Sequence, residues 1–250
     1  MKAKPALPAG QSADPPFEAH ALEKSISDFL NTPLDVASAQ LEGTGDQPPP
    51  KTVGACKFGV YAFFDYDCEP IYVGQTRERL STRIRRHLTG QRSDAVAKGV
   101  LDPYEVRKIQ VWPVPGGQNV RRKEDRDVWQ SIILYLDRLE AAVYLRLTAE
   151  SLHQVMLNEA APKLVGDVAP RIEEQPYSGE IVNREVYKLR SHIDTRIARR
   201  CTTLARLAQN ISERHASAGL RSALLAQVRR LEWLAKRRLD FIASKDEERG

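Results

Sequence analysis

The sequence predicts an α+β protein: a small three-stranded antiparallel sheet flanked by helices, followed by a C-terminal α-helical hairpin. Three observations predict this class. Residues 58–74 hold two aromatic and β-branched runs separated by a turn. Residues 122–147 repeat apolar side chains at helical spacing, and residues 186–242 do so in two successive segments. A length of 250 residues suits one large domain or two ordinary ones.

The first fifty residues contain 8 of the 15 prolines. Apolar side chains recur every three to five residues from Phe17 to Leu30, which predicts one amphipathic helix at about 18–31. The prolines at 48–50 predict an extended linker. We therefore expect a partly disordered arm over residues 1–53, before a compact domain over residues 54–166.

The compact domain is expected to begin with a β-hairpin. Residues 58–64 favour a strand, residues 65–70 have turn chemistry, and residues 71–74 resume the strand. Leu80, Ile84 and Leu88 then recur at helical spacing. This pattern predicts a short helix with Thr76 as its cap.

A third strand is predicted over residues 106–114, and a long helix over residues 122–147 that continues after a break toward Leu157. Pro162, Gly166 and Pro170 mark a domain boundary. The tail, residues 170–250, predicts two long helices, over 186–211 and 220–242. Gly219 is expected to separate them.

The tail is strongly basic, with 14 basic and only 4 acidic side chains between positions 184 and 238. Arginine binds phosphate through two parallel hydrogen bonds, so this density favours a polyanion partner. We predict that Arg196, Arg199 and Arg200 form part of a phosphate clamp on DNA. The alternatives are solvated helix faces or a dimerisation hairpin, in which the apolar stripes matter instead of the arginines.

Other features exclude several classes of protein. No window approaches the ~18 uncharged apolar residues of a membrane span, and the N-terminus has no apolar segment of the secretory kind. Cys56, Cys68 and Cys201 are too few and too far apart for a disulfide framework or a zinc finger. These observations predict a cytoplasmic protein without a membrane partner.

Chemically useful side chains gather around the predicted hairpin. Tyr61 and Tyr72 lie on adjacent strands, so their rings are expected to meet on one face of the sheet. Gly74 ends the second strand and allows a ligand to approach the backbone closely. Arg83 and His87 are four residues apart on the next helix and share a face. Such a group suits a phosphodiester substrate.

These residues resemble the GIY-YIG nuclease superfamily over residues 54–166. Gly59-Val60-Tyr61 resembles the first motif, and Tyr72-Val73-Gly74 resembles the second. Arg83-x3-His87 is similar to the family's catalytic helix. The segment 139–144 resembles the one that carries a metal-binding glutamate, and the segment 157–162 the one that carries an asparagine.

The resemblance implies a Mg²⁺- or Mn²⁺-dependent endonuclease that hydrolyses DNA through a single metal ion and water attack assisted by tyrosine. It implies a catalytic set of six residues, in which Glu140 also binds the metal: Tyr61, Tyr72, Arg83, His87, Glu140 and Asn158. Tyr61 would activate the attacking water and Tyr72 would orient it. Among DNA-binding residues we include Gly74, Arg85 and Arg86 with the three tail arginines.

Two departures leave alternatives open. Glu140 and Asn158 are 18 positions apart, longer than is usual in the family, so Glu150 is a rival metal ligand. Asn158 also precedes Pro162 where the family has the opposite order, which leaves its role in question.

The functional alternatives are a catalytically inactive nucleic-acid-binding module and a nuclease for single-stranded DNA or RNA. By analogy, the stand-alone arrangement resembles restriction or phage-defence endonucleases. A homodimer is expected if one active centre serves each strand.

Overall fold

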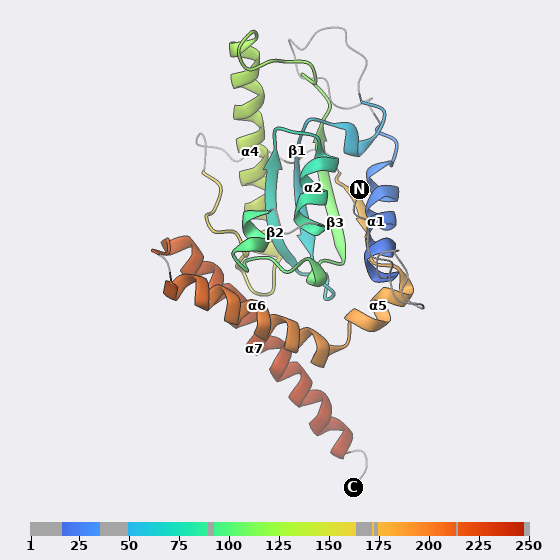
Figure 1. Ribbon diagram of the computed structural model, residues 1–250, viewed down its shortest axis with the longest axis vertical. Helices are drawn as coiled ribbons and strands as arrows, with labels where there is room; N and C mark the ends of the chain where they lie inside the picture. The colour runs from blue at the N-terminus through green and yellow to red at the C-terminus, as the bar shows by residue number, and fades with distance from the viewer. Residues whose placement is uncertain are drawn as a thin grey trace, which may run out of the picture.

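The computed structural model describes residues 17–35, 50–89, 93–163, 172, 175–213 and 215–247. Within these residues the protein has a mixed α+β fold with a four-stranded antiparallel sheet and seven α-helices (Figure 1). The predicted α+β class is therefore confirmed, but the prediction of three strands is wrong. The positions 1–16, 36–49 and 164–170, which include much of the predicted arm, its linker and the predicted boundary, lie outside the described residues.

The sheet has the order β2-β1-β3-β4. Its strands are β1 (Phe58–Phe64), β2 (Pro70–Thr76), β3 (Lys108–Val114) and β4 (Tyr177–Glu180). The unpredicted β4 is four residues long and lacks alternating apolar side chains, so its sequence has no strand signal. It pairs with β3, and Gly179 makes room for the Phe29 ring, which lies 2.3 Å from where a Cβ would be.

The predicted hairpin is confirmed by antiparallel pairing of β1 with β2, in which Tyr61 faces Gly74 across the strands. Every residue of β1 is buried, because helices cover both faces of the sheet. Tyr61 and Phe63 point to the face covered by α1 (Phe17–Leu30) and α2 (Leu80–Leu88). Val60 and Ala62 point to the face covered by α4 (Arg126–Glu150).

The start of α2 differs from its prediction. Arg79, not Thr76, occupies the N-cap position, and no side chain caps the helix there. The Thr76 hydroxyl instead accepts a hydrogen bond from the Glu78 amide at 3.1 Å, within the turn that leads from β2 into the helix. A 3₁₀ turn, η1 (Val53–Ala55), precedes β1, and the short helix α3 (Asp94–Ala97) and a second 3₁₀ turn, η2 (Pro103–Glu105), follow α2.

The tail contains three helices instead of two. The predicted helix over 186–211 is divided into α5 (Arg184–Arg190) and α6 (Ile193–Glu213), and α6 packs against α7 (Ala218–Glu247) as the predicted hairpin (Figure 1). Gly219 does not separate helices but lies in the first turn of α7. A Cβ there would lie 1.7 Å from the Glu159 carbonyl oxygen, so close packing requires this glycine.

The arm and the tail share their core with the central domain. Ile26 of α1, Leu207 of α6 and Ala226 of α7 are fully buried in the same apolar cluster as Tyr61. The predicted boundaries at residues 53 and 170 therefore do not separate independent cores among the described residues. None of the described helices combines the length and apolar character needed to span a membrane.

Candidate active site

The two predicted tyrosines meet on one face of the sheet. The ring centroids of Tyr61 and Tyr72 are 6.4 Å apart and their planes are inclined by 27°. Gly74 lies under them, and a Cβ at this position would come within 2.6 Å of the Tyr61 hydroxyl oxygen. The glycine predicted to admit a ligand is thus required by the packing of the Tyr61 ring.

A continuous chain of hydrogen bonds runs through Tyr61. Arg83 Nε donates to the Tyr61 hydroxyl at 3.1 Å, and that hydroxyl lies 2.8 Å from His87 Nε2. His87 Nδ1 is 2.6 Å from Ser93 Oγ. Because the Arg83 guanidinium only donates hydrogen bonds, the Tyr61 proton points to His87 Nε2, and a neutral His87 then carries its own proton on Nδ1 toward Ser93.

Burial determines the protonation of this chain. Burial, followed by the charges of Arg83 and Arg86, lowers the pKa of His87 to about 3, so the imidazole is neutral near pH 7. Burial also raises the pKa of Tyr61 above its ordinary value, although the Arg83 hydrogen bond opposes that change. With its pKa this low, the His87 imidazole serves as a hydrogen-bond acceptor for the Tyr61 hydroxyl and not as a base for its proton, so the chain holds Arg83 in a fixed position.

A cavity of about 260 Å³ opens beside this chain. Tyr72, Arg83 and His87 line it, together with Asp94 and Glu159. Tyr61 has no exposed surface and does not line the cavity. The predicted direct contact of Tyr61 with an attacking water therefore does not fit this conformation, whereas Tyr72 and Arg83 are accessible.

Glu140 approaches the sheet from α4, on the face opposite the tyrosines. Gln75 of β2 donates through Nε2 to Glu140 Oε2 at 3.1 Å and to Asp137 Oδ1 at 2.6 Å. Burial raises the pKa of Glu140 to about 7, with the Gln75 hydrogen bond opposing and Asp137 adding to the rise. Glu140 also raises the pKa of Tyr61 and of Tyr72, so its charge acts on both phenols across edge strand β2.

The surroundings of Glu140 fit a hard cation. Gln75 Oε1 is a buried oxygen without a hydrogen-bond partner, and it belongs to the amide that already contacts both carboxylates. Oxygen donors of this kind suit Mg²⁺, which retains several waters when few protein ligands are present. No group of three or more His, Cys, Asp or Glu side chains arranged for a metal occurs in the described residues, so such an ion would depend on waters and substrate oxygens.

The rival ligand, Glu150, lies elsewhere. It is the last residue of α4, is exposed, and contacts Arg146 at 3.7 Å one turn earlier. Ten residues of α4 separate it from Glu140, about 15 Å along the helix axis. This placement favours Glu140.

Asn158 has a backbone role that the sequence did not predict. Its amide nitrogen donates to the Val73 carbonyl at 2.6 Å, and its amide oxygen accepts from the Val73 amide at 3.1 Å. The side chain thereby occupies the free edge of β2 like one residue of an additional strand. Asn158 also lines the cavity, but its main hydrogen-bonding groups are used by the backbone.

The arginines predicted to bind DNA next to the site have partners within the chain. Arg85 donates to Ser27 Oγ at 2.8 Å and thus ties α2 to α1. Arg86 forms an ion pair with Glu78. Both guanidinium groups are partly buried, which leaves each less free to bind phosphate than the sequence suggested.

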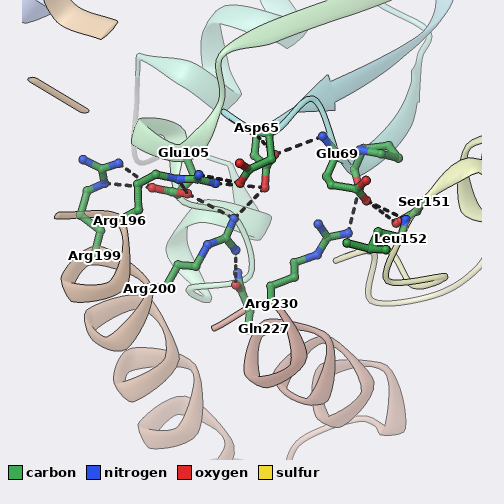
Figure 2. A network of polar contacts seen from close by, with 12 residues as sticks. Asp65, Glu69, Glu105, Ser151, Leu152, Arg196, Arg199, Arg200, Gln227 and Arg230 are labelled. Atoms are coloured by element: carbon green, nitrogen blue, oxygen red, sulfur yellow. Dashed lines mark hydrogen bonds and ion pairs between the residues drawn. The ribbon is translucent and has the colours of Figure 1, made fainter. Parts of the chain in front are cut away.

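The tail arginines form a buried ionic network with the sheet domain, as Figure 2 shows. Arg200 Nη2 lies 3.0 Å from Asp65 Oδ2 and 3.2 Å from Glu105 Oε2. Arg196 contacts Asp67 at 2.6 Å, and Arg199 contacts Glu105 at 2.6 Å. Arg196 and Arg200 are each 3% exposed, so their predicted use as phosphate contacts is wrong for this structure. Their carboxylate partners are 91 to 135 positions away in sequence, beyond any local pattern.

Sequence reasoning missed three residues of the site: Ser93, Gln75 and Asp137. Gln75 directly follows the second motif, and Asp137 precedes Glu140 by one helical turn, so spacing alone offered a signal for these two. Ser93 offered none, since it reaches His87 through the fold of the segment before α3.

Comparisons of the chain with protein-family models, with curated proteins and with solved structures found no match.

Proposed function

We propose that this protein is a metal-dependent endonuclease that hydrolyses phosphodiester bonds of DNA. One observation carries the proposal: the buried chain from Arg83 through Tyr61 to His87, which borders a cavity lined by Tyr72. The motif resemblance to GIY-YIG nucleases supports the same reading, and the basic composition of the chain suits a polyanion.

In this proposal Arg83 and Tyr72 contact the substrate. The Arg83 guanidinium stabilises the negative charge that grows on the phosphate during attack, a role worth ~10²–10³ in rate for a preorganised donor. Tyr72 orients the attacking water or a phosphate oxygen at the cavity wall. Tyr61 and His87 act from behind as positioning residues, because the Tyr61 hydroxyl accepts a hydrogen bond from Arg83 and donates one to His87 Nε2.

Glu140 is the residue that would hold a Mg²⁺ or Mn²⁺ ion, with Asp137 beside it and the Gln75 amide nitrogen donating to both carboxylates. A divalent ion supplies charge stabilisation to the scissile phosphate and its leaving oxygen. The residues of this chain contribute a preformed position: Gln75 holds both carboxylates in place against β2.

The test is cleavage of supercoiled plasmid DNA with Mg²⁺ and with EDTA. We expect nicking or linearisation only with the metal. Arg83→Ala should lose ~10²-fold or more in rate, whereas the exposed Arg79→Ala, at the start of the same helix, should retain it. Equal rates for the two variants would contradict the proposal.

The same assay separates the alternatives. Tight binding without cleavage under all metal conditions would identify an inactive nucleic-acid-binding module. Faster cleavage of single-stranded DNA or RNA than of duplex would change the substrate class. Duplex DNA is favoured because, among the described residues, Tyr72 is the one tyrosine, phenylalanine or tryptophan that lines the cavity, so no cluster of rings is available there to stack on unpaired bases.

A further inference from the structure

Helix α7 has a second apolar face that the protein's own core does not use. Its buried side points to the rest of the molecule through Ala223, Ala226, Gln227, Arg230 and Leu234, each 2% exposed or less. On the opposite side, Leu225, Val228, Leu239 and Ile242 are 53%, 41%, 67% and 43% exposed. The last turns of α7 extend away from the sheet and the other helices (Figure 1), beyond the ion pairs of Arg237 with Asp67 and of Arg238 with Asp194.

The exposed apolar residues follow a heptad repeat. Positions 225, 228, 232, 235, 239, 242 and 246 are spaced alternately by three and four residues, and all seven side chains are exposed. They are Leu, Val, Glu, Ala, Leu, Ile and Asp in that order. This 3-4 spacing is the pattern of a helix that packs lengthwise against another helix. Because the buried side of α7 is diametrically opposite, a partner helix would not meet the body of the molecule.

We call these seven positions the exposed stripe. Its polar residues indicate which partner helix can pack against it. In a parallel pairing with a second copy, Glu232 would face Glu232 and Asp246 would face Asp246, so like charges would meet in the seam. An antiparallel pairing centred between positions 232 and 235 removes both conflicts. It places, in successive layers, Arg221 against Asp246, Leu225 against Ile242, Val228 against Leu239, and Glu232 against Ala235 of the other copy.

Each of these layers is complementary in size or charge. The end layers pair an exposed arginine with an exposed aspartate. The central layer sets Glu232, which is already paired with Lys236 at 2.7 Å, against the small side chain of Ala235. The symmetry repeats every layer twice, giving four apolar layers and two ion pairs over a helix segment of about 38 Å.

We infer that α7 is the interface of an antiparallel homodimer, with a second copy of this chain as the occupant of the exposed stripe. The inference is independent of the nuclease proposal, because it depends only on the residues of the exposed stripe. Its consequence is that two molecules place their sheet domains on opposite sides of one helix pair.

Light scattering during size exclusion, from about 1 to 100 µM protein, tests the dimer without any nucleic acid. The wild type is expected to dimerise. Leu239→Asp should raise the dimer dissociation constant ~100-fold or more, because symmetry introduces the buried charge twice. The matched control is Leu189→Asp, on α5, which is 57% exposed but off the stripe and should leave the dimer intact. Circular dichroism checks that both variants remain folded.

Charge reversal tests the register. Arg221→Glu should weaken the dimer, and adding Asp246→Arg in the same chain should restore it, since each ion pair is then re-formed in reverse. A monomeric wild type at 100 µM, a dimer that survives Leu239→Asp, or a double variant as weak as the single one would overturn the inference.

Discussion

The candidate active site and the tail network hold their arginines in different ways. At the candidate active site, Arg83 contacts Tyr61 and borders a cavity of about 260 Å³. In the tail network, Arg196 and Arg200 are enclosed by Asp65, Asp67 and Glu105. Arg83 retains a side open to a substrate, whereas each tail guanidinium is already neutralised by carboxylates of the same chain.

This contrast shows how far a basic composition predicts DNA binding. The tail is rich in arginine, but its buried arginines stabilise the docking of α6 on the sheet domain. The site has a single accessible arginine, whose function is indicated by its neighbours. Arginine density therefore predicts a polyanion surface only after the acidic partners are known.

The largest expected effect concerns Glu140. Glu140→Gln removes the charge but keeps the shape, so metal-dependent cleavage should fall by ~10³-fold or more. Glu150→Gln is the matched control on the same helix and should cleave at the wild-type rate. Single-turnover cleavage rates at saturating enzyme measure both. A dead Glu150→Gln with an active Glu140→Gln would reverse the ligand assignment.

Removal of a tail arginine should act on stability instead of activity. Arg200→Met leaves Asp65 and Glu105 buried without one of their cations, which should lower the free energy of unfolding by ~3–5 kcal/mol. Arg206→Met, at an exposed position of α6, should change it little. Urea denaturation measures the difference. If Arg200→Met kept its stability but bound DNA with a flatter salt dependence, the phosphate-clamp prediction would be right.

Tyr61→Phe tests the role of the Tyr61 hydroxyl at the candidate active site. The variant removes the acceptor of Arg83 and the donor to His87, so cleavage should fall ~10²-fold. The buried hydroxyl is hydrogen-bonded, so the free energy of unfolding should also fall by ~1–3 kcal/mol. Rates and denaturation curves together test this dual role. Unchanged cleavage would reduce Tyr61 to a packing residue.

The smallest effect near neutral pH is a pH dependence of stability from His87, which grows as the pH falls. In the unfolded chain this imidazole gains a proton below about pH 6.5, but in the folded protein it stays neutral until about pH 3. The unfolded state therefore binds more protons in this window, and stability falls as the pH falls, by up to ~1.4 kcal/mol per pH unit. The wild type minus His87→Gln difference in unfolding free energy should show that slope. A flat difference would mean that His87 is not buried as described.

Local patterns of the sequence were sufficient for much of the site. The two aromatic and β-branched runs in residues 58–74, separated by a turn, predict the hairpin, and the four-residue spacing of Arg83 and His87 predicts that they share a face; the structure confirms both. The same patterns could not locate Ser93 or the backbone role of Asn158. Those contacts arise from loops whose paths depend on packing.

By itself, the sequence determined the elements whose signals lie within one or two turns of chain: the hairpin, α2, α4 and the amphipathic helices of the tail. Only the tertiary structure decided that β4 joins the sheet, that Gly74 and Gly219 are required by close packing, and that Arg196 and Arg200 are buried. The physical reason is the same in each case. A short polar strand, a missing Cβ or a basic side chain acquires its role from atoms up to 135 positions away, and residue spacing carries no information about such partners.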